Sequence, residues 1–301
     1  MRLKYLFLAI LLALPVVFLA ACSRNTIVPD TDLPFEVIIR DTPEPEEINP
    51  NYLLSVHFIN VGEGDAILVV QGSYAMLVDG GPTGAGTTVM NYMRSHGITT
   101  LEYVVATHPF ADHVGGLQYV LQRMRTRHVL LPMVYHDTPA YNGFLLAVEG
   151  SGAYVEVPFA GDTFNLGDAV ITILSPNSTD TWENRANYSI VMRIEFGTTS
   201  FLLTGDAMRE VEANLLDSTM QLSSDVLKVA RHGSSAATTS GFLDSVNPSI
   251  AVISAGDGNT FLSNEVLRRL ANAGAHVFRT DQNGNIVITS NGTILGVAVD
   301  R

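Results

Sequence analysis

The stretch Thr107-His108-Pro109-Phe110-Ala111-Asp112-His113-Val114-Gly115-Gly116 decides how this chain folds and where its chemistry lies. It directly follows a short buried strand predicted over 102–106, and in sheets built from strand–helix units, sites gather where the strands end. Two histidines and an aspartate within six residues suit a metal site with imidazole and carboxylate ligands. Asp112 and His113 are adjacent, so both can approach one ion from the start of a helix. We therefore expect His108, Asp112 and His113 to be metal ligands.

Three further polar clusters also follow predicted strands. Asp206 comes after the strand expected over 200–203, where a carboxylate can bridge two metals or complete one site. The alternative is that it caps the helix expected over 208–216. His232 follows the strand expected over 226–229, and Asp79 ends the strand expected over 74–78.

We therefore expect Asp206 and His232 to join the metal ligands and Asp79 to lie at the pocket. The remaining histidines have no such neighbours, and we interpret them as structural or surface residues: His57, His96, His128, His136 and His276.

Strand and helix patterns alternate through the chain from residue 53 onward. Helices are predicted over 87–96, 114–123, 140–148, 208–216, 240–246 and 264–271. The strands between them form both hairpins and strand–helix–strand units. This mixture predicts two mixed sheets packed against each other, with helices outside.

The N-terminus reads as a targeting segment. Arg2 and Lys4 precede an uncharged run over 5–21, which is short for a spanning helix of about 20 residues and suits a secretory signal. The run closes in Leu19-Ala20-Ala21-Cys22, which resembles the bacterial lipobox and contains the only cysteine of the sequence. We expect a lipoprotein signal over 1–21, lipidation of Cys22, and an extracytoplasmic protein anchored to the membrane by lipid. An ordinary cleaved signal or an uncleaved anchor are the alternatives.

Residues 22–50 are acidic and rich in proline, which predicts a solvated linker ahead of a folded domain over 51–301. The formal net charge is −13, from 17 basic and 30 acidic residues. Because duplex nucleic acid is bound mainly through Lys and Arg, this balance disfavours a duplex-coating protein without excluding a local basic groove. One cysteine excludes an intrachain disulfide and Cys-rich zinc or iron–sulfur sites, so any metal must be held by His and carboxylates.

The stretch 107–116 resembles the metallo-β-lactamase signature T-H-x-H-x-D-H-x-G-G. The wider pattern is similar to one branch of that family, the hydrolase domain of the competence protein ComEC and its secreted stand-alone relatives. The other matching stretches are 56–66, 77–81, 187–191, 201–207, 227–234 and 247–248. The resemblance implies a four-layer αββα sandwich with the metal site at the sheet edges between two similar halves. It also implies metal-dependent hydrolysis of a phosphodiester or another small anionic ester.

The departures from the family pattern fall on metal ligands. Phe110 stands at the second His of the signature, and Arg231 stands at the first His of the family's usual His-His-Gly-Ser. The segment 260–264 also lacks a histidine that the family often has there. Neither a phenyl ring nor a guanidinium can ligate a metal. The resemblance thus implies a partly degenerate site, in which Asp112, His113 and Asp206 survive, with His232 as a further candidate.

Two functions of different classes follow. In the first, one Zn²⁺ or Mn²⁺ activates water, Asp112 and Arg231 are the catalytic residues, and Arg231 stabilises an anionic transition state. In the second, the metal is weak or lost, and the protein binds a small anionic ligand or a partner at the cell surface. Arg231 would then pair with Asp112 or Asp206 in place of the metal. In either case Phe110 and Asn187 are expected at the pocket.

Overall fold

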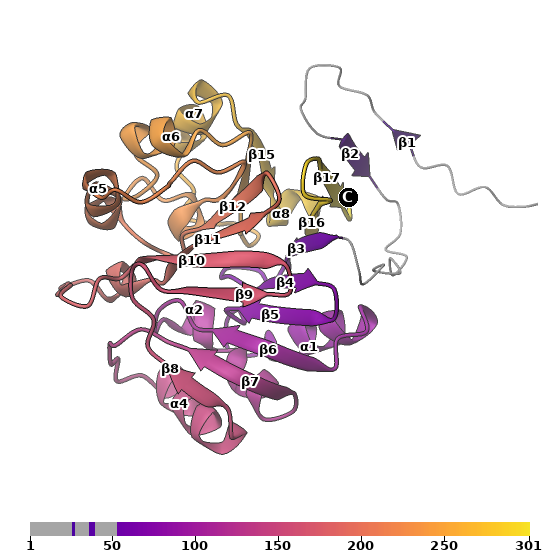
Figure 1. Cartoon of the computed structure of the whole chain (residues 1–301), viewed down its shortest axis with the longest axis vertical. Coiled ribbons are helices and arrows are strands. Elements are labelled where there is room, and N and C mark those ends of the chain that lie inside the picture. Colours follow the sequence, from indigo (N-terminus) through magenta and orange to yellow (C-terminus); the bar gives the residue numbers. More distant parts are fainter. Residues whose placement is uncertain (1–25, 28–35, 40–52) are drawn as a thin grey trace, which may run out of the picture.

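The computed structural model describes residues 26–27, 36–39 and 53–301 (Figure 1). The expected signal over 1–21, the lipidation site Cys22 and most of the expected linker lie outside the described residues. In the described part of the chain, no helix has both the length and the apolar character that crossing a bilayer requires.

The first sheet has ten strands in the order β1-β2-β17-β16-β3-β4-β5-β6-β7-β8. Its strands are β1 (Thr26–Ile27), β2 (Glu36–Ile39), β3 (Leu54–Phe58), β4 (Ile67–Gln71), β5 (Tyr74–Val78), β6 (Thr100–Val105), β7 (Arg125–Leu130), β8 (Tyr154–Glu156), β16 (Ile286–Ser290) and β17 (Leu295–Val299). β3, β4 and β5 are antiparallel neighbours, whereas β5, β6, β7 and β8 run parallel. The sheet is therefore mixed, as the sequence predicts.

The second sheet has seven strands in the order β15-β14-β13-β12-β11-β10-β9. Its strands are β9 (Thr163–Leu166), β10 (Ala169–Ser175), β11 (Val191–Phe196), β12 (Thr199–Leu203), β13 (Val226–Lys228), β14 (Ile250–Ile253) and β15 (His276–Arg279). β9 to β12 are antiparallel, and β12 to β15 are parallel. Each sheet thus joins an antiparallel half to a parallel half, and the parallel halves carry the strand ends that matter for the site.

Helices cover the outer face of each sheet (Figure 1). The helices are α1 (Gly86–Ser95), α2 (Ala111–Val114), α3 (Leu117–Leu121), α4 (Pro139–Ser151), α5 (Arg209–Asp217), α6 (Ser240–Val246), α7 (Asn264–Asn272) and α8 (Thr280–Asn283), with 3-10 turns η1 (Arg185–Tyr188) and η2 (Ala230–Gly233). Apolar residues of α1, α3 and α4 pack on the first sheet, and those of α5, α6 and α7 pack on the second.

The period-two alternation of the strands explains the layers. In β12, Phe201 and Leu203 belong to the core between the sheets, whereas Leu202 packs under the helices of the second sheet. In β4, Val69 faces the inter-sheet core and Leu68 faces the helices. A strand covered on both faces needs apolar residues throughout, which is why these runs read as continuous hydrophobic stretches. The expected αββα sandwich is confirmed.

Two sequence expectations need correction. The single helix expected over 114–123 is two short helices, α2 and α3, separated at Gly115 and Gly116. A Cβ at Gly116 would lie 1.9 Å from the carbonyl oxygen of Gly80, so the two backbone segments are in direct contact there. α2 begins at Ala111, three residues before the expected start. The strands β8 and β9 were not expected, because β8 is exposed along its length and has no apolar period to detect.

Candidate metal centre

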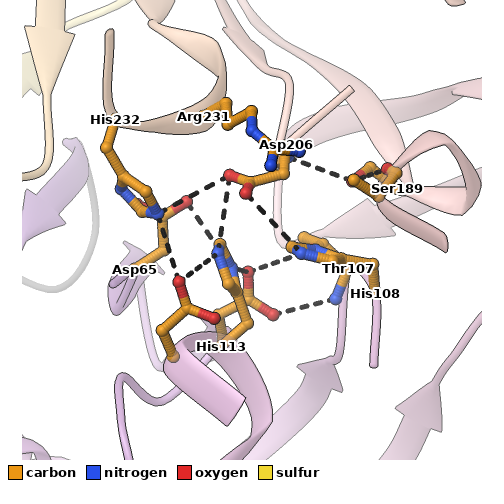
Figure 2. A network of polar contacts seen from close by, with 12 residues as sticks. Asp65, Thr107, His108, His113, Ser189, Asp206, Arg231 and His232 are labelled. Atoms are coloured by element: carbon orange, nitrogen blue, oxygen red, sulfur yellow. Dashed lines mark hydrogen bonds and ion pairs between the residues drawn. The ribbon is translucent and has the colours of Figure 1, made fainter. Parts of the chain in front are cut away.

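Four strands of the parallel halves deliver the polar residues to one place. Asp79 follows β5, the segment 107–113 follows β6, Asp206 follows β12, and His232 lies in η2 after β13. β5 and β6 are parallel neighbours, as are β12 and β13, so each pair of strands ends on one edge. Figure 2 shows His108, His113, Asp206 and His232 pointing toward one another.

Four donor atoms form a ring of close contacts. Nε2 of His113 lies 3.9 Å from Oδ2 of Asp112 and 3.5 Å from Oδ1 of Asp206. Nε2 of His232 lies 3.5 Å from Oδ2 of Asp112 and 3.7 Å from Oδ1 of Asp206. Ligands at about 2.0–2.2 Å from one tetrahedral ion lie about 3.4 Å apart, so these four atoms are close to the spacing of a single metal site.

His108 lies to one side of this ring. Its Nε2 is 3.8 Å from Oδ2 of Asp206, the second oxygen of the same carboxylate. The five residues expected as metal ligands are therefore brought together, although His108 approaches only Asp206 at this distance. Three groups of mutually close donors occur in the described residues: His108, His113 and Asp206; Asp112, His113 and His232; and Asp65, Asp79 and His113.

The hydrogen bonds set the tautomers of the three histidines. Nδ1 of His113 lies 2.7 Å from Oδ2 of Asp79, and Nδ1 of His232 lies 3.1 Å from the carbonyl oxygen of Ser254. The hydroxyl of Thr107 donates to Asp79, so it can accept from Nδ1 of His108 at 3.0 Å. In the uncharged form of each ring, Nδ1 therefore carries the hydrogen and Nε2 turns its lone pair toward the cluster.

Those inward atoms have no hydrogen-bond partner. Nε2 of His108, His113 and His232 and Oδ1 of Asp206 are buried and unpaired. Buried polar atoms without partners are rare in folded proteins, and one cation in the ring would satisfy those of His113, His232 and Asp206 together. The donor set therefore fits a divalent transition metal.

The charges of the cluster shift its titration. Burial lowers the pKa of His113, but the carboxylates of Asp206 and Asp79 outweigh it and raise that pKa well above its ordinary value. Burial raises the pKa of Asp206, but His113 and His232 hold it well below its ordinary value. The pKa of Asp112 falls to about 2, because a hydrogen bond to His232 and the charge of His113 outweigh its burial. Burial, then the neighbouring His113, lowers the pKa of His108 to about 3.

Asp79 is wholly buried behind His113 and does not line a pocket. Its oxygens accept from the backbone N–H and the hydroxyl of Thr107 at 2.8 and 2.7 Å, in addition to His113. Such a carboxylate fixes the ring orientation of a metal-binding imidazole. Asp79 is therefore a supporting residue.

The binding-module hypothesis predicted that Arg231 pairs with Asp112 or Asp206. In the described residues Arg231 forms no such pair. In the described part of the chain, Asp112 and Asp206 pair only with histidines. The Arg231 guanidinium instead lies 3.5 Å from Sδ of Met208, with its carbon 6.0 Å from the ring centre of Phe261. Both Arg231 and His232 have left-handed backbones, with φ of 49° and 53°. Two successive residues in that region store strain, which is typical of functional sites.

Phe110 and Asn187 take different places. The ring of Phe110 lies edge-on to His108, with centroids 4.9 Å apart, and its centroid is 5.5 Å from that of His136. Asn187 accepts from the backbone N–H of Met208 at 3.0 Å and donates to Glu210 at 3.2 Å, so it holds the start of α5 and takes no part in the donor ring.

Sequence reasoning missed two residues, Asp65 and Lys228. Both are buried beside the cluster, and they form an ion pair. A usable signal was present, because Lys228 is a charged residue inside the apolar run 226–229, where lysine is seldom found unless it is paired. Asp65 gave a weaker signal, since it follows a glycine turn as many surface aspartates do.

A profile of the metallo-beta-lactamase superfamily matches residues 59–257. The chain belongs to the metallo-beta-lactamase superfamily. It is 30% identical over 251 residues to ComE operon protein 3 of Bacillus subtilis, a match that covers 77% of this chain and 32% of that protein. It is 28% identical over 238 residues to Recombination protein 2 of Haemophilus influenzae, covering 77% of this chain and 28% of the relative. The chain thus spans about a third of the length of these relatives.

Solved structures share the fold. The metallo-beta-lactamase fold protein YhfI from Bacillus subtilis superposes with a TM-score of 0.53 at 15% identity, over 79% of this chain and 100% of that one. The diiron β-hydroxylase CmlA from Streptomyces venezuelae gives a TM-score of 0.53 at 14% identity, over 79% of this chain and 54% of CmlA. At these identities the likeness extends to the fold alone. With the superfamily match, it confirms the family inferred from the signature.

Proposed function

We propose that this protein is a hydrolase that uses one divalent metal ion and acts on a phosphodiester or another small anionic ester. The observation that carries the proposal is the set of buried, unpartnered donor atoms on His113, Asp206 and His232, with Asp112 completing the ring. Imidazole and carboxylate ligands suit Zn²⁺ and Mn²⁺. Such an ion supplies Lewis acidity and makes water a nucleophile at neutral pH.

The chain's own residues prepare the site for this chemistry. Asp79 and the carbonyl oxygen of Ser254 hold His113 and His232 with their lone pairs inward. Asp112 is the most open of the four donors, with 31% of its side chain exposed, so substrate and water approach from its side. Burial keeps the pKa of His108 near 3, with His113 adding to the effect, so at neutral pH the imidazole is uncharged and its Nε2 lone pair is free for a ligand.

Arg231 supplies the positive charge for an anionic substrate. Its guanidinium has a thioether sulfur and a distant ring as neighbours, so its fork of N–H groups is available for two oxygens of a phosphoryl group. It therefore stabilises charge that develops on the ester in the transition state. Removing it should lower kcat more than it raises KM.

The first metal position of the family is degenerate in this proposal. Phe110 stands beside His108 in place of an imidazole, so His108 and Asp206 are left as an incomplete pair of ligands. One ion per chain follows from this arrangement.

We propose further that lipid on Cys22 anchors the protein outside the cytoplasmic membrane, with the signal 1–21 removed. Several acyl chains would hold it stably, because each buried CH₂ contributes about 0.8 kcal/mol. The net charge of −13 disfavours long duplex nucleic acid, which needs many Lys and Arg contacts. Mass spectrometry and membrane fractionation of wild type and Cys22→Ser test the anchor. A variant that stays membrane-bound with unchanged mass contradicts it.

Metal analysis and a hydrolysis panel test the function. We expect about one equivalent of Zn²⁺ or Mn²⁺ per chain, and metal-dependent cleavage of bis(p-nitrophenyl) phosphate that Asp206→Asn abolishes. Phosphomonoester and lactone substrates in the same panel separate the ester classes. Binding of metal without turnover of any ester would favour the second function, a catalytically inactive module that binds a ligand or partner.

A further inference from the structure

Lys228, the last residue of β13, is wholly buried, and the chemistry above gives it no part. Its ammonium group forms an ion pair with Asp65, which is itself 1% exposed, and donates a hydrogen bond of 3.0 Å to the carbonyl oxygen of Gly205. A buried ion pair loses the hydration of both charges, so it adds little stability by itself. Its place beside the metal ligands therefore calls for another explanation.

The carboxylate of Asp65 lies behind two of the ligands. One oxygen is 3.7 Å from Nδ1 of His113, and the other is 3.9 Å from Nδ1 of His232. These are the sides of the imidazoles that face away from the donor ring. Asp65 thus stands between two N–H groups that are already bonded to Asp79 and to the carbonyl oxygen of Ser254.

The carbonyl of Gly205 connects the same ammonium to a third ligand. Gly205 directly precedes Asp206 and has a left-handed backbone, with φ of 50°. Its oxygen accepts from Lys228 and, at 3.4 Å, from the backbone N–H of Arg231. Lys228 therefore fixes the peptide that carries Asp206, next to the turn that carries His232.

We propose that Lys228 is a positioning residue, which keeps the side chains of His113, His232 and Asp206 oriented toward the metal. It does so by compensating Asp65 and by anchoring Gly205. Without this cation, Asp65 would be an unpaired buried carboxylate whose nearest donors are the Nδ1–H groups of His113 and His232. It would compete with Asp79 and Ser254 for those hydrogens and turn the imidazoles out of alignment. The inference rests on the proposed metal site.

The test is the dissociation constant of Mn²⁺ and of Zn²⁺, measured by chelator competition on folded protein. Lys228→Met should weaken binding about 10–100-fold, the range found when residues that support metal ligands are removed. Asp65→Asn with Lys228→Met removes the uncompensated carboxylate and should bind more tightly than Lys228→Met alone. The matched control is Arg193→Met, which removes a buried cation that bonds Glu195 and Ser223 and none of the site residues. It should lower the melting temperature and leave metal affinity unchanged.

The outcomes separate this inference from the proposed function. A folded Lys228→Met variant that binds both ions within twofold of wild type overturns it. If that variant does not fold, Lys228→Gln carries the same test, because the amide removes the cation that compensates Asp65 and keeps a donor for the carbonyl oxygen of Gly205. Affinity within twofold of wild type in that variant overturns the inference equally. A wild-type protein that binds neither ion contradicts the proposed function and this inference together.

Discussion

Oδ2 of Asp79 and Nδ1 of His113 lie 2.7 Å apart, and neither side chain is exposed to solvent. Asp79 has a left-handed backbone, with φ of 57°, which a glycine would adopt more easily. The chain accepts this strain at a residue that directs an imidazole toward the metal cluster.

Asp79→Asn should weaken metal binding about 10–100-fold. The amide must turn its NH₂ toward either the Thr107 N–H or the His113 N–H, so one of these donors loses its acceptor. Chelator competition measures the effect. Asp225→Asn is the control, because Asp225 accepts from Ser200 outside the cluster. Equal affinity in the Asp79 variant and wild type would show that Asp79 does not orient His113.

His232→Ala and His108→Ala should differ sharply. His232 belongs to the ring of four donors, so its loss should reduce bound metal to well below one equivalent. His108 is near only one oxygen of Asp206, so its loss should leave the stoichiometry at one with a smaller change in affinity. Metal analysis after dialysis compares the two. The opposite ranking would place the ion at His108.

Phe110→His combined with Arg231→His should raise the stoichiometry from one ion to two. The first change adds an imidazole beside His108, and the second removes a cation that would repel a second metal. Metal stoichiometry is the measurement, because the second change also removes the guanidinium proposed to stabilise the transition state. If wild type already holds two ions, or the double variant gains none, the first site is not degenerate in the way proposed.

Metal binding should strengthen as pH rises from 6 to 8. In the metal-free protein the pKa of His113 and that of His232 are raised above their unfolded values. Protonation of these rings therefore stabilises the folded state at low pH. This stabilisation is lost as the pH rises through the pKa values of the folded state. The pKa values of Asp112 and Asp206 are lowered, so these ionised carboxylates stabilise the folded state above about pH 4. That stabilisation is lost as the pH falls through their folded-state pKa values. A bound metal displaces the histidine protons, so its stabilising effect grows by about 1.4 kcal/mol per pH unit for each proton. Melting temperatures with and without Mn²⁺ at both pH values measure this, and a metal-induced shift that is equal at pH 6 and pH 8 contradicts it.

Gly116→Ala should destabilise the fold by about 1–3 kcal/mol or more, because the new methyl group would overlap the carbonyl oxygen of Gly80. Gly150→Ala is the matched control, since it lies in α4 with open space around it and should stabilise that helix by up to about 1 kcal/mol. Chemical denaturation measures both. A tolerated alanine at Gly116 would mean that the two backbones can separate.

Much of the architecture was predictable because strand ends and apolar periods are local signals. The strand expected over 200–203 and the helix expected over 264–271 match β12 and α7 almost residue for residue. The break at Gly115 and Gly116 was not predictable, because it depends on the distant backbone of Gly80.

The candidate site divides in the same way. Spacing in the sequence was enough to predict His108, Asp112 and His113 as site residues. Asp206 and His232 could be predicted because each follows a strand. Asp65 could not be recognised, because its role depends on Lys228, which is 163 positions away in sequence. Arg231 was placed at the right turn, but its backbone is left-handed and its guanidinium lies against Met208 instead of a carboxylate.

The four residues of the donor ring come equally from the two halves of the chain. Asp112 and His113 precede β8, whereas Asp206 and His232 follow β9. A chain divided between Glu156 and Thr163 would yield two fragments, each with half of the donor ring and neither able to retain the ion. Recovery of metal binding on mixing the two fragments would then show that they had reassembled. Metal binding is therefore a direct assay for complementation of the split protein.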